Sequence, residues 1–240
     1  MENSFYIPQT HSTNDLLKTM AREQQLPEGF VVHTGFQTAG KGQAGNSWES
    51  AEGENLLFSM VLYPVRIKVE EQFLISQLVS VAIKGVLDKY ADNISVKWPN
   101  DIYWNDRKLG GILIENSLQS GRIKSTVIGI GINVNQQQFV SNAPNPVSLF
   151  QITGKQHNIE SLLTNLCESI LDHYKKLNPP FIRAAYGELL YRKTGFHAYK
   201  TDEESFMAQL VAVHPDGRLQ LETEAGERKN FYFKEVQFVI

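Results

Sequence analysis

The sequence is poor in cysteine, and this scarcity excludes a secreted domain held together by disulfides. Cys167 is the single cysteine among 240 residues, so no internal disulfide forms, which fits a reducing compartment. It lies in NIESLLTNLCESILDHY, whose apolar spacing is typical of a helix that packs on a core. We therefore interpret Cys167 as a buried structural thiol rather than a nucleophile.

The sequence also lacks the apolar segments that direct a chain to a membrane or across it. Its first residues, MENSFYIPQTHSTND, contain neither the basic region nor the apolar region of a secretory signal. No stretch approaches the roughly 18 consecutive apolar residues that a membrane span needs. We therefore expect a cytoplasmic protein with no membrane partner.

A basic excess is absent as well. The chain has 23 Lys and Arg against 26 Asp and Glu, a net charge of −3, so no general positive field attracts nucleic acid. Hydrophobic residues make up 42% and charged residues 20% of the chain, which is typical of a folded globular protein. The length is sufficient for one large domain, or for one large and one small domain.

Residue patterns predict a sheet combined with helices. The capping residues Ser12, Thr13 and Asn14 start a first helix. Further helices are predicted at 70–91, 158–177 and 179–192, and strands at 4–7, 30–36, 55–64, 94–99, 101–105, 108–118 and 122–135. The connectors NDRK and QSGR are typical of hairpins, so this part of the sheet is expected to be antiparallel.

The pattern changes near residue 193. Short alternating runs follow, separated by the turn sequences DEES, HPDGR and EAGER at roughly 10-residue spacing, which is typical of a small β-barrel or sandwich. We place a domain boundary near residue 190. The expected domains are 1–190 and 191–240.

A glycine-rich stretch, QTAGKGQAGNSW, occupies residues 37–48. It has the glycine spacing of a P-loop, but Asn46 and Ser47 stand where Lys-Ser/Thr is required. It also spells the dinucleotide pattern from Gly40 to Gly45, yet the polar sequence that follows is a poor helix. A flexible surface loop is one interpretation. A lysine, three amide side chains and a tryptophan in the same stretch favour a binding loop.

Two further segments contain candidate site residues. In KWPNDIYWNDRKLGGILIE (97–115), a hairpin turned at Asn105-Asp106 would bring Lys108 and Asp101 together, where a lysine can neutralise a carboxylate or phosphate. A surface hairpin with a solvated lysine is the alternative. In GIGINVN (129–135), alternating glycines leave one face of a strand bare, so another group lies against the backbone, unless the glycines serve tight core packing.

Together these segments resemble the biotin–protein ligases. HSTND, QTAGKGQAGNSWES with GENLLFSMVLYP, KWPNDIYWNDRKLGGILIE and GIGINVN occur in that family's order and spacing, over residues 5 to about 135. The resemblance implies an α+β fold like that of biotinyl-protein ligases and class II aminoacyl-tRNA synthetases. This is a mixed, largely antiparallel sheet with helices on one face, followed by a small SH3-like β-barrel. Since the chain begins directly at the catalytic domain, we expect the stand-alone class without an N-terminal DNA-binding domain.

The resemblance also implies an activity and its partners. Members join biotin to ATP, giving biotinyl-5'-AMP and pyrophosphate, and then transfer the biotinyl group to one lysine of a biotin carboxyl carrier domain. Biotin and ATP are then the substrates, Mg²⁺ is the expected metal, and nucleic acid is not a partner. Some members are monomers and others homodimers, and the sequence leaves this open.

Site residues follow from the resemblance, motif by motif. The expected catalytic residues are Lys108, Lys41 and Asp101, of which Asp101 is also the expected Mg²⁺ ligand. The expected biotin-binding residues are Ser12, Thr13, Asn14, Gln37, Gly40, Lys41, Gly42, Gln43, Lys108 and Gly110. The expected ATP- and adenylate-binding residues are Lys41, Gln43, Trp48, Asn100, Lys108, Gly131 and Asn133. Whether Asn100 and Asp101 orient Lys108 or help to hold Mg²⁺ stays open.

The sequence departs from the commoner family pattern at two positions. Many members carry arginine where this chain has Lys41 and Gln43. Lys41 keeps the charge of arginine but lacks its planar guanidinium, and Gln43 lacks the charge. We therefore predict that the adenylate dissociates faster than from an arginine-bearing loop.

Two alternative functions remain. A lipoate or octanoate ligase is disfavoured because the amide- and hydroxyl-rich residues suit a ureido ring. A non-catalytic biotin sensor is disfavoured because both lysines are present.

Overall fold

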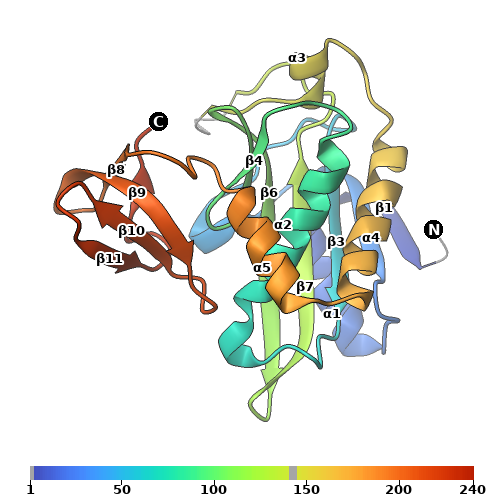
Figure 1. Ribbon diagram of the computed structural model, residues 1–240. Helices are drawn as coiled ribbons and strands as arrows, with labels where there is room; N and C mark the ends of the chain where they lie inside the picture. Colours follow the sequence, from blue (N-terminus) through green and yellow to red (C-terminus); the bar gives the residue numbers. More distant parts are fainter. Residues whose placement is uncertain (1–2, 141–144) are drawn as a thin grey trace.

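The structure, a computed structural model, describes residues 3–140 and 145–240, and its largest element is a seven-stranded sheet (Figure 1). The strand order is β1-β2-β3-β7-β6-β5-β4; β1 and β2 are parallel and all other neighbours are antiparallel. The strands are β1 (Ser4–Thr10), β2 (Val31–Gln37), β3 (Leu56–Leu62), β4 (Ile94–Lys97), β5 (Asp101–Trp104), β6 (Arg107–Gln119) and β7 (Arg122–Ile132). The predicted mixed, largely antiparallel α+β sheet is confirmed.

Helices cover the two faces of this sheet unequally (Figure 1). The helices are α1 (Thr13–Glu23), α2 (Phe73–Leu87), α3 (Leu149–Thr153), α4 (Ile159–Lys175) and α5 (Pro179–Glu188), and short 3-10 turns occur at Gln43–Gly45 and Val69–Glu71. Helices α2, α4 and α5 pack together on one face, as predicted. Helix α1 packs against β2, β3 and β7 on the other face, which the sequence did not predict.

Strand β3 explains why both faces are covered. All seven of its residues are buried, as in a strand that lies between two layers. Phe58 and Met60 belong to the large core beneath α2. Val61 points the opposite way, into a smaller core with Leu17 of α1 and Val127 of β7. The side that carries α1 is therefore only partly filled by apolar side chains.

The start of α1 places polar residues against the sheet. Ser12 is the N-cap, and its Oγ accepts a hydrogen bond from the Asp15 backbone N–H at 3.5 Å. Thr13 and Asn14 in the first turn are buried together with Ser12. Buried polar groups require hydrogen-bond partners, so these side chains must be paired inside the protein rather than hydrated at its surface.

A second sheet follows the helices and is antiparallel, with strand order β11-β10-β9-β8-β12. Its strands are β8 (His197–Lys200), β9 (Ser205–Val213), β10 (Leu219–Thr223), β11 (Arg228–Phe231) and β12 (Gln237–Phe238). The Trp98 indole N–H donates to the Gly217 carbonyl at 2.9 Å and so links the two sheets. The small β-rich C-terminal part is confirmed. The boundary near residue 190 falls between α5 and β8 and stays a prediction.

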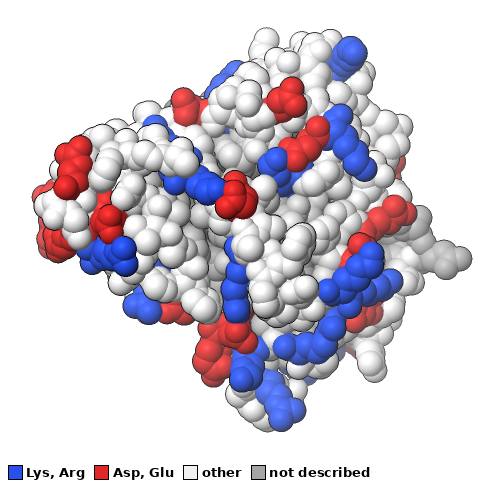
Figure 2. Space-filling view, in the orientation of Figure 1, with Lys and Arg blue, Asp and Glu red and all other residues white. Residues whose placement is uncertain are grey.

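Several other sequence predictions can be compared with the fold. Cys167 is 2% exposed on α4, and burial raises the pKa of its thiol to about 12, so a buried structural thiol is confirmed. None of the helices within residues 3–140 and 145–240 is long and apolar enough to cross a membrane. On the face drawn in Figure 2, Lys and Arg alternate with Asp and Glu.

Candidate functional site

A cavity of about 950 Å³ lies on the α1 side of the large sheet, and the C-terminal sheet contributes one of its walls. Its lining includes most of the residues predicted from the sequence, namely Ser12, Thr13, Asn14, Gln37, Lys41, Gly42, Gln43, Trp48, Asn100, Asp101, Lys108 and Gly131. Gly40, Gly110 and Asn133 are not among the lining residues. Four motifs that are far apart in the sequence therefore meet around one space.

One end of the cavity is a network of hydroxyl and amide groups. The Thr13 backbone N–H and its hydroxyl both donate to Gln37 Oε1, at 2.8 and 3.1 Å. Ser59 Oγ lies 2.7 Å from Thr13 Oγ1 and 2.5 Å from Asn14 Oδ1. The network is uncharged and offers both donors and acceptors. Ser59 was missed from the sequence, where its one signal is a hydroxyl within the apolar run NLLFSMVLY.

Gly129 makes room for this network. A Cβ at Gly129 would collide with Asn14 Oδ1, so only glycine lets the amide lie against β7. Asn14 Nδ2 donates to Glu115 Oε2 at 2.7 Å, and Glu115 Oε1 accepts from Lys18 Nζ at 2.7 Å. The bare strand face predicted from GIGINVN is thus occupied, and Asn14 is one of its two occupants.

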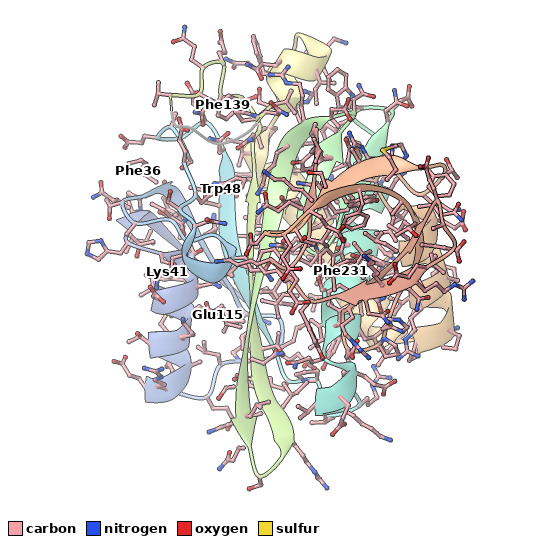
Figure 3. All side chains as sticks on the ribbon, turned by 90° about the vertical axis from the view of Figure 1, so that its left-hand side faces the viewer. Phe36, Lys41, Trp48, Glu115, Phe139 and Phe231 are labelled. Carbon is pink, nitrogen blue, oxygen red and sulfur yellow. The ribbon has the colours of Figure 1, made fainter. Side chains whose placement is uncertain are left out.

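The second occupant is Trp48, at the end of the glycine-rich loop. A Cβ at Gly131 would lie 2.6 Å from Trp48 Cε2, so the ring rests directly on the β7 backbone. The loop folds back on itself because Gly42 N donates to Asn46 O at 2.7 Å and Trp48 N donates to Gly40 O at 2.9 Å. Trp48 Nε1 is buried and has no hydrogen-bond partner among the described residues. The stretch is therefore a folded loop over the site (Figure 3).

Lys41 belongs to this loop and is tied to α1. Its Nζ lies 2.5 Å from Asp15 Oδ2, and Lys18 lies 2.9 Å from the other oxygen. Partial burial of Asp15 favours its neutral form, but hydrogen bonds from Lys41 and Lys18 outweigh this and lower the pKa of the Asp15 carboxyl. Lys41 thus pairs with α1 through an exposed ion pair that the sequence did not predict.

Lys108 and Asp101 form the charged centre of the site. Lys108 Nζ lies 2.7 Å from Asp101 Oδ1, and both side chains are about one quarter exposed, at 27% and 21%. The turn between β5 and β6 places Asn105 at φ 48°, a left-handed conformation that asparagine tolerates. The predicted approach of these two residues across the hairpin is confirmed. The Trp48 ring centroid lies 5.8 Å from Lys108 Nζ.

Three predicted residues hold the framework around this centre. Asn100 Nδ2 donates to the Ile112 carbonyl at 2.5 Å and so fastens the start of β5 to β6. Asn133 Nδ2 donates to Val147 O at 3.0 Å, while its buried Oδ1 has no partner in the part of the chain that the structure describes. A Cβ at Gly110 would lie 2.5 Å from Ile132 Cδ1, so this glycine serves close packing.

The carboxylates of the cavity provide few ligands for Mg²⁺. Within residues 3–140 and 145–240, no three His, Cys, Asp or Glu side chains gather where they could hold a metal. Mg²⁺ commonly takes one or two carboxylates and completes its shell with waters and substrate phosphates. Asp101 fits such a site as a single carboxylate, but it is paired with Lys108 here.

Two further parts of the lining were missed from the sequence. Lys97 of β4 faces the cavity beside Asp101, its cross-strand partner, and the alternation of KWPND would have placed it there. Lys200, Asp202 and Phe238 line the cavity from the C-terminal sheet. No sequence pattern pointed to these three residues, because the way the two sheets pack decides their position.

The fold and this polar, lysine-containing cavity define an α+β protein with a candidate small-molecule site. The chain belongs to the biotin/lipoate A/B protein ligase family, whose family model matches residues 6–133. That range contains the start of α1, the glycine-rich loop and all strands of the large sheet, except for the first residues of β1.

Three known proteins illustrate the similarity. The chain is 30% identical to the bifunctional ligase/repressor BirA of Bacillus subtilis over 217 residues, which cover 85% of this chain and 64% of that protein. A biotin protein ligase from Aquifex aeolicus, solved in complex with biotin and ATP, superposes with a TM-score of 0.80 at 23% identity over 100% of both chains. One from Leishmania major, in complex with biotinyl-5-AMP, gives 0.69 at 20% identity over 97% and 99%.

The chain spans less than two thirds of the length of the curated relatives it matches, with 64% for the Bacillus protein and 39% for BirA of Escherichia coli. The two solved structures share less than a quarter of their residues with this chain, so they establish its fold.

Proposed function

We propose that this protein is an ATP-dependent biotin–protein ligase. It activates biotin as biotinyl-5'-AMP and transfers the biotinyl group to a lysine of a biotin carboxyl carrier domain. The observation that carries the proposal is the cavity, which joins an uncharged hydroxyl–amide network to a lysine–carboxylate pair beneath a folded glycine-rich loop. Family membership supports it, as do similar structures solved with biotin and ATP or with biotinyl-5-AMP.

The hydroxyl–amide network would bind the ureido ring of biotin. That ring is neutral and presents N–H donors and a carbonyl acceptor, so it needs complementary polar groups rather than charge. Thr13, Asn14 and Gln37 already hold one another in place, with Ser12 capping the same helix turn. Such a network is preorganised, which reduces the entropy that binding would cost. A dithiolane ring would leave these polar groups without partners, so biotin fits better than lipoate.

Lys108 would act where the negative charges meet. A biotin carboxylate oxygen attacks the α-phosphorus of ATP and forms a new P–O bond. The bond to the α,β-bridging oxygen breaks, and its electron pair leaves with pyrophosphate. Two anions must approach each other, at a cost of about 1 kcal/mol in water that grows in a drier site. Lys108 offsets this repulsion, and Asp101 holds its ammonium in place at 2.7 Å. Mg²⁺ bound with the nucleotide would supply further positive charge.

The glycine-rich loop would cover the adenylate. The backbone N–H groups of Gly40 and Lys41 suit a phosphate, and Trp48 offers an aromatic face on the glycine floor of β7. Trp48 and Gln43 line the cavity, and the buried Trp48 Nε1 and Gln43 Oε1 both lack partners among the described residues. Unsatisfied polar atoms beside a cavity point to a ligand that completes them.

In the transfer step, the protein mainly has to position the carrier lysine beside the adenylate. The adenylate is a strong acyl donor, so the carrier lysine attacks its carbonyl carbon, AMP leaves with the electron pair, and the lysine proton passes to water or to Asp101. We further propose that the protein acts in the cytoplasm, that a carrier domain rather than nucleic acid is its partner, and that residues 1–190 and 191–240 are its two domains.

Mass spectrometry of a carrier domain tests the proposal. The domain is incubated with the protein, ATP, Mg²⁺ and biotin, and we expect a gain of one biotinyl group that disappears when ATP is omitted. A reaction with lipoate in place of biotin distinguishes the related activity. Lys108→Met should lose the product, whereas Lys89→Met, which removes an exposed lysine outside the cavity, should retain it. Lipoylation without biotinylation would contradict the proposal.

A further inference from the structure

Lys97 is a cation in the cavity that the proposed chemistry does not yet use. Its side chain is half-buried at the end of β4 and lines the cavity. Lys97 Nζ donates to the Tyr103 hydroxyl at 3.2 Å and lies 5.0 Å and 5.4 Å from the ring centroids of Tyr103 and Phe238. Phe238 comes from β12, so this aromatic box closes only where the C-terminal sheet meets the large sheet.

Among the residues that the structure describes, the ammonium of Lys97 has no ion-pair partner. Within the described ranges, no carboxylate oxygen lies within 4.0 Å of Lys97 Nζ. Asp101 is its cross-strand partner, but that carboxylate is already 2.7 Å from Lys108. One carboxylate thus faces two lysines, so one positive charge is in excess among Lys97, Asp101 and Lys108. A half-buried charge without a counter-ion is costly, so the arrangement favours an anion that enters the cavity.

The strand register fixes where Lys97 lies relative to the other groups. A row runs across the sheet through Lys97, Asp101, Gly111 and Gly131 on β4, β5, β6 and β7. The hydroxyl–amide network lies over the central strand β7, against Gly129. Lys97 lies on the edge strand β4, two strand spacings or about 10 Å beyond β6. Lys108 stands between them, because its Cε would be 3.7 Å from a Cβ at Gly111.

This order matches the geometry of phosphoryl chemistry. In a displacement at phosphorus, the attacking and leaving oxygens lie roughly in line on opposite sides of the phosphorus atom. If biotin approaches from the β7 side, as the proposed function requires, pyrophosphate must leave toward β5 and β4. We propose that Lys97 binds the β- and γ-phosphates of ATP and the pyrophosphate that departs, within a pocket closed by Tyr103 and Phe238.

The assignment separates Lys97 from Lys108 in the reaction. Lys108 stands near both the carboxylate and the α-phosphate, so it would contact the reacting atoms in adenylate synthesis and the acyl phosphate during transfer. Lys97 would contact only the two phosphates that leave as pyrophosphate. Once these have gone, Lys97 has no ligand, and the transfer of the biotinyl group proceeds without it.

Half-reactions measured with the full chain test this inference. Biotin-dependent exchange of labelled pyrophosphate into ATP reports the first step, and transfer from preformed biotinyl-5'-AMP to a carrier domain reports the second. In Lys97→Met, one charge-assisted hydrogen bond is lost. We therefore expect kcat/KM for ATP to fall about 10- to 100-fold and the inhibition constant of pyrophosphate to rise similarly, with transfer within about two-fold of wild type. Lys97→Arg should restore most of the exchange activity, because it keeps the charge.

The controls separate this inference from the proposed function. Lys89→Met removes a surface lysine outside the cavity, and it should leave both half-reactions and pyrophosphate inhibition unchanged. A wild-type chain that forms no biotinyl-5'-AMP would overturn the proposed function itself. If the wild-type chain is active, unchanged pyrophosphate inhibition in Lys97→Met would overturn the role of Lys97 alone. An equal loss in both half-reactions would do the same, because it would indicate a structural role.

Discussion

Substitution of two glycines of β7 is expected to affect the two halves of the cavity separately. Gly129 lies beneath Asn14, and Gly131 lies beneath Trp48. Both are on a strand paired on either side, with β3 and β6, so the backbone cannot retreat from an added methyl group. In Gly129→Ala the Asn14 amide must leave its position, and in Gly131→Ala the indole ring must lift. We therefore expect the first substitution to weaken biotin binding and the second to weaken nucleotide binding.

The magnitudes follow from the distances. A Cβ at Gly131 would lie 2.6 Å from Trp48 Cε2, whereas carbon atoms normally meet at about 3.5 to 4.0 Å, so the ring must move by about 1 Å. Loss of stacking on an aromatic ring costs about 1–3 kcal/mol per base, so the Kd for ATP should rise about 5- to 150-fold. Gly129→Ala leaves the Ser59 hydroxyl and the Glu115 carboxylate without Asn14, and the free energy of unfolding should fall by about 2–4 kcal/mol.

Calorimetric titration of each variant with biotin and with ATP, together with urea unfolding, measures both effects. Gly85→Ala is the matched control, since no atom lies within 4 Å of its added Cβ and Gly85 is in helix α2. It should stabilise the fold by about 0.5–1 kcal/mol and leave both affinities unchanged. Equal weakening of the two ligands by Gly129→Ala and Gly131→Ala, or a wild-type Kd for ATP in Gly131→Ala, would refute the division of the cavity.

Three further substitutions test individual contacts. Asp101→Asn removes the negative partner of Lys108, so adenylate synthesis should fall at least about 10-fold. Transfer from preformed adenylate then separates two roles of Asp101. Normal transfer would mean that Asp101 orients Lys108, and lost transfer would mean that it acts as a base. Gln43→Arg should slow adenylate dissociation in a filter assay by about 3- to 10-fold, because a charged fork replaces a neutral amide; no slowing would contradict our explanation of leakage. The lowered pKa of Asp15 stabilises the fold above pH of about 3.8, and this contribution is lost as pH falls through the folded value. Asp15→Asn should therefore flatten the acid side of the stability profile, by less than about 1 kcal/mol because its pair with Lys41 is exposed; an unchanged profile would contradict this.

Local patterns were sufficient to predict most of the large sheet. Hairpin connectors such as NDRK set the register between β5 and β6, and that register brought Lys108 to Asp101. The alternating glycines of β7 left a bare strand face and tight core packing open, and in the structure Asn14 and Trp48 lie against the bare face. These predictions succeeded because period-two alternation and turn residues act over a few positions of the chain.

Other features depend on contacts between distant segments, and the sequence could not reveal them. The short helix α3 was missed, since its five residues, Leu149–Thr153, are too few to show a period. The position of α1 on the face opposite α2 was missed because amphipathic spacing marks a buried side without saying which layer it meets. The wall formed by Phe238 arises from how the second sheet packs on the first, which no motif encodes.

The glycine-rich loop shows how structure changes the meaning of a motif. A lysine between glycines suggests a phosphate ligand, and Lys41 lines the cavity while its Nζ also pairs with Asp15 of α1. What rests on the floor of the site is Trp48, at the other end of the same loop, because Gly131 leaves the β7 backbone bare. If an adenylate binds beneath the loop, Trp48 would stack on the base and backbone N–H groups of the loop would bind the phosphate. Lys108 and Lys97, which the sheet itself positions, would add positive charge at the reaction centre.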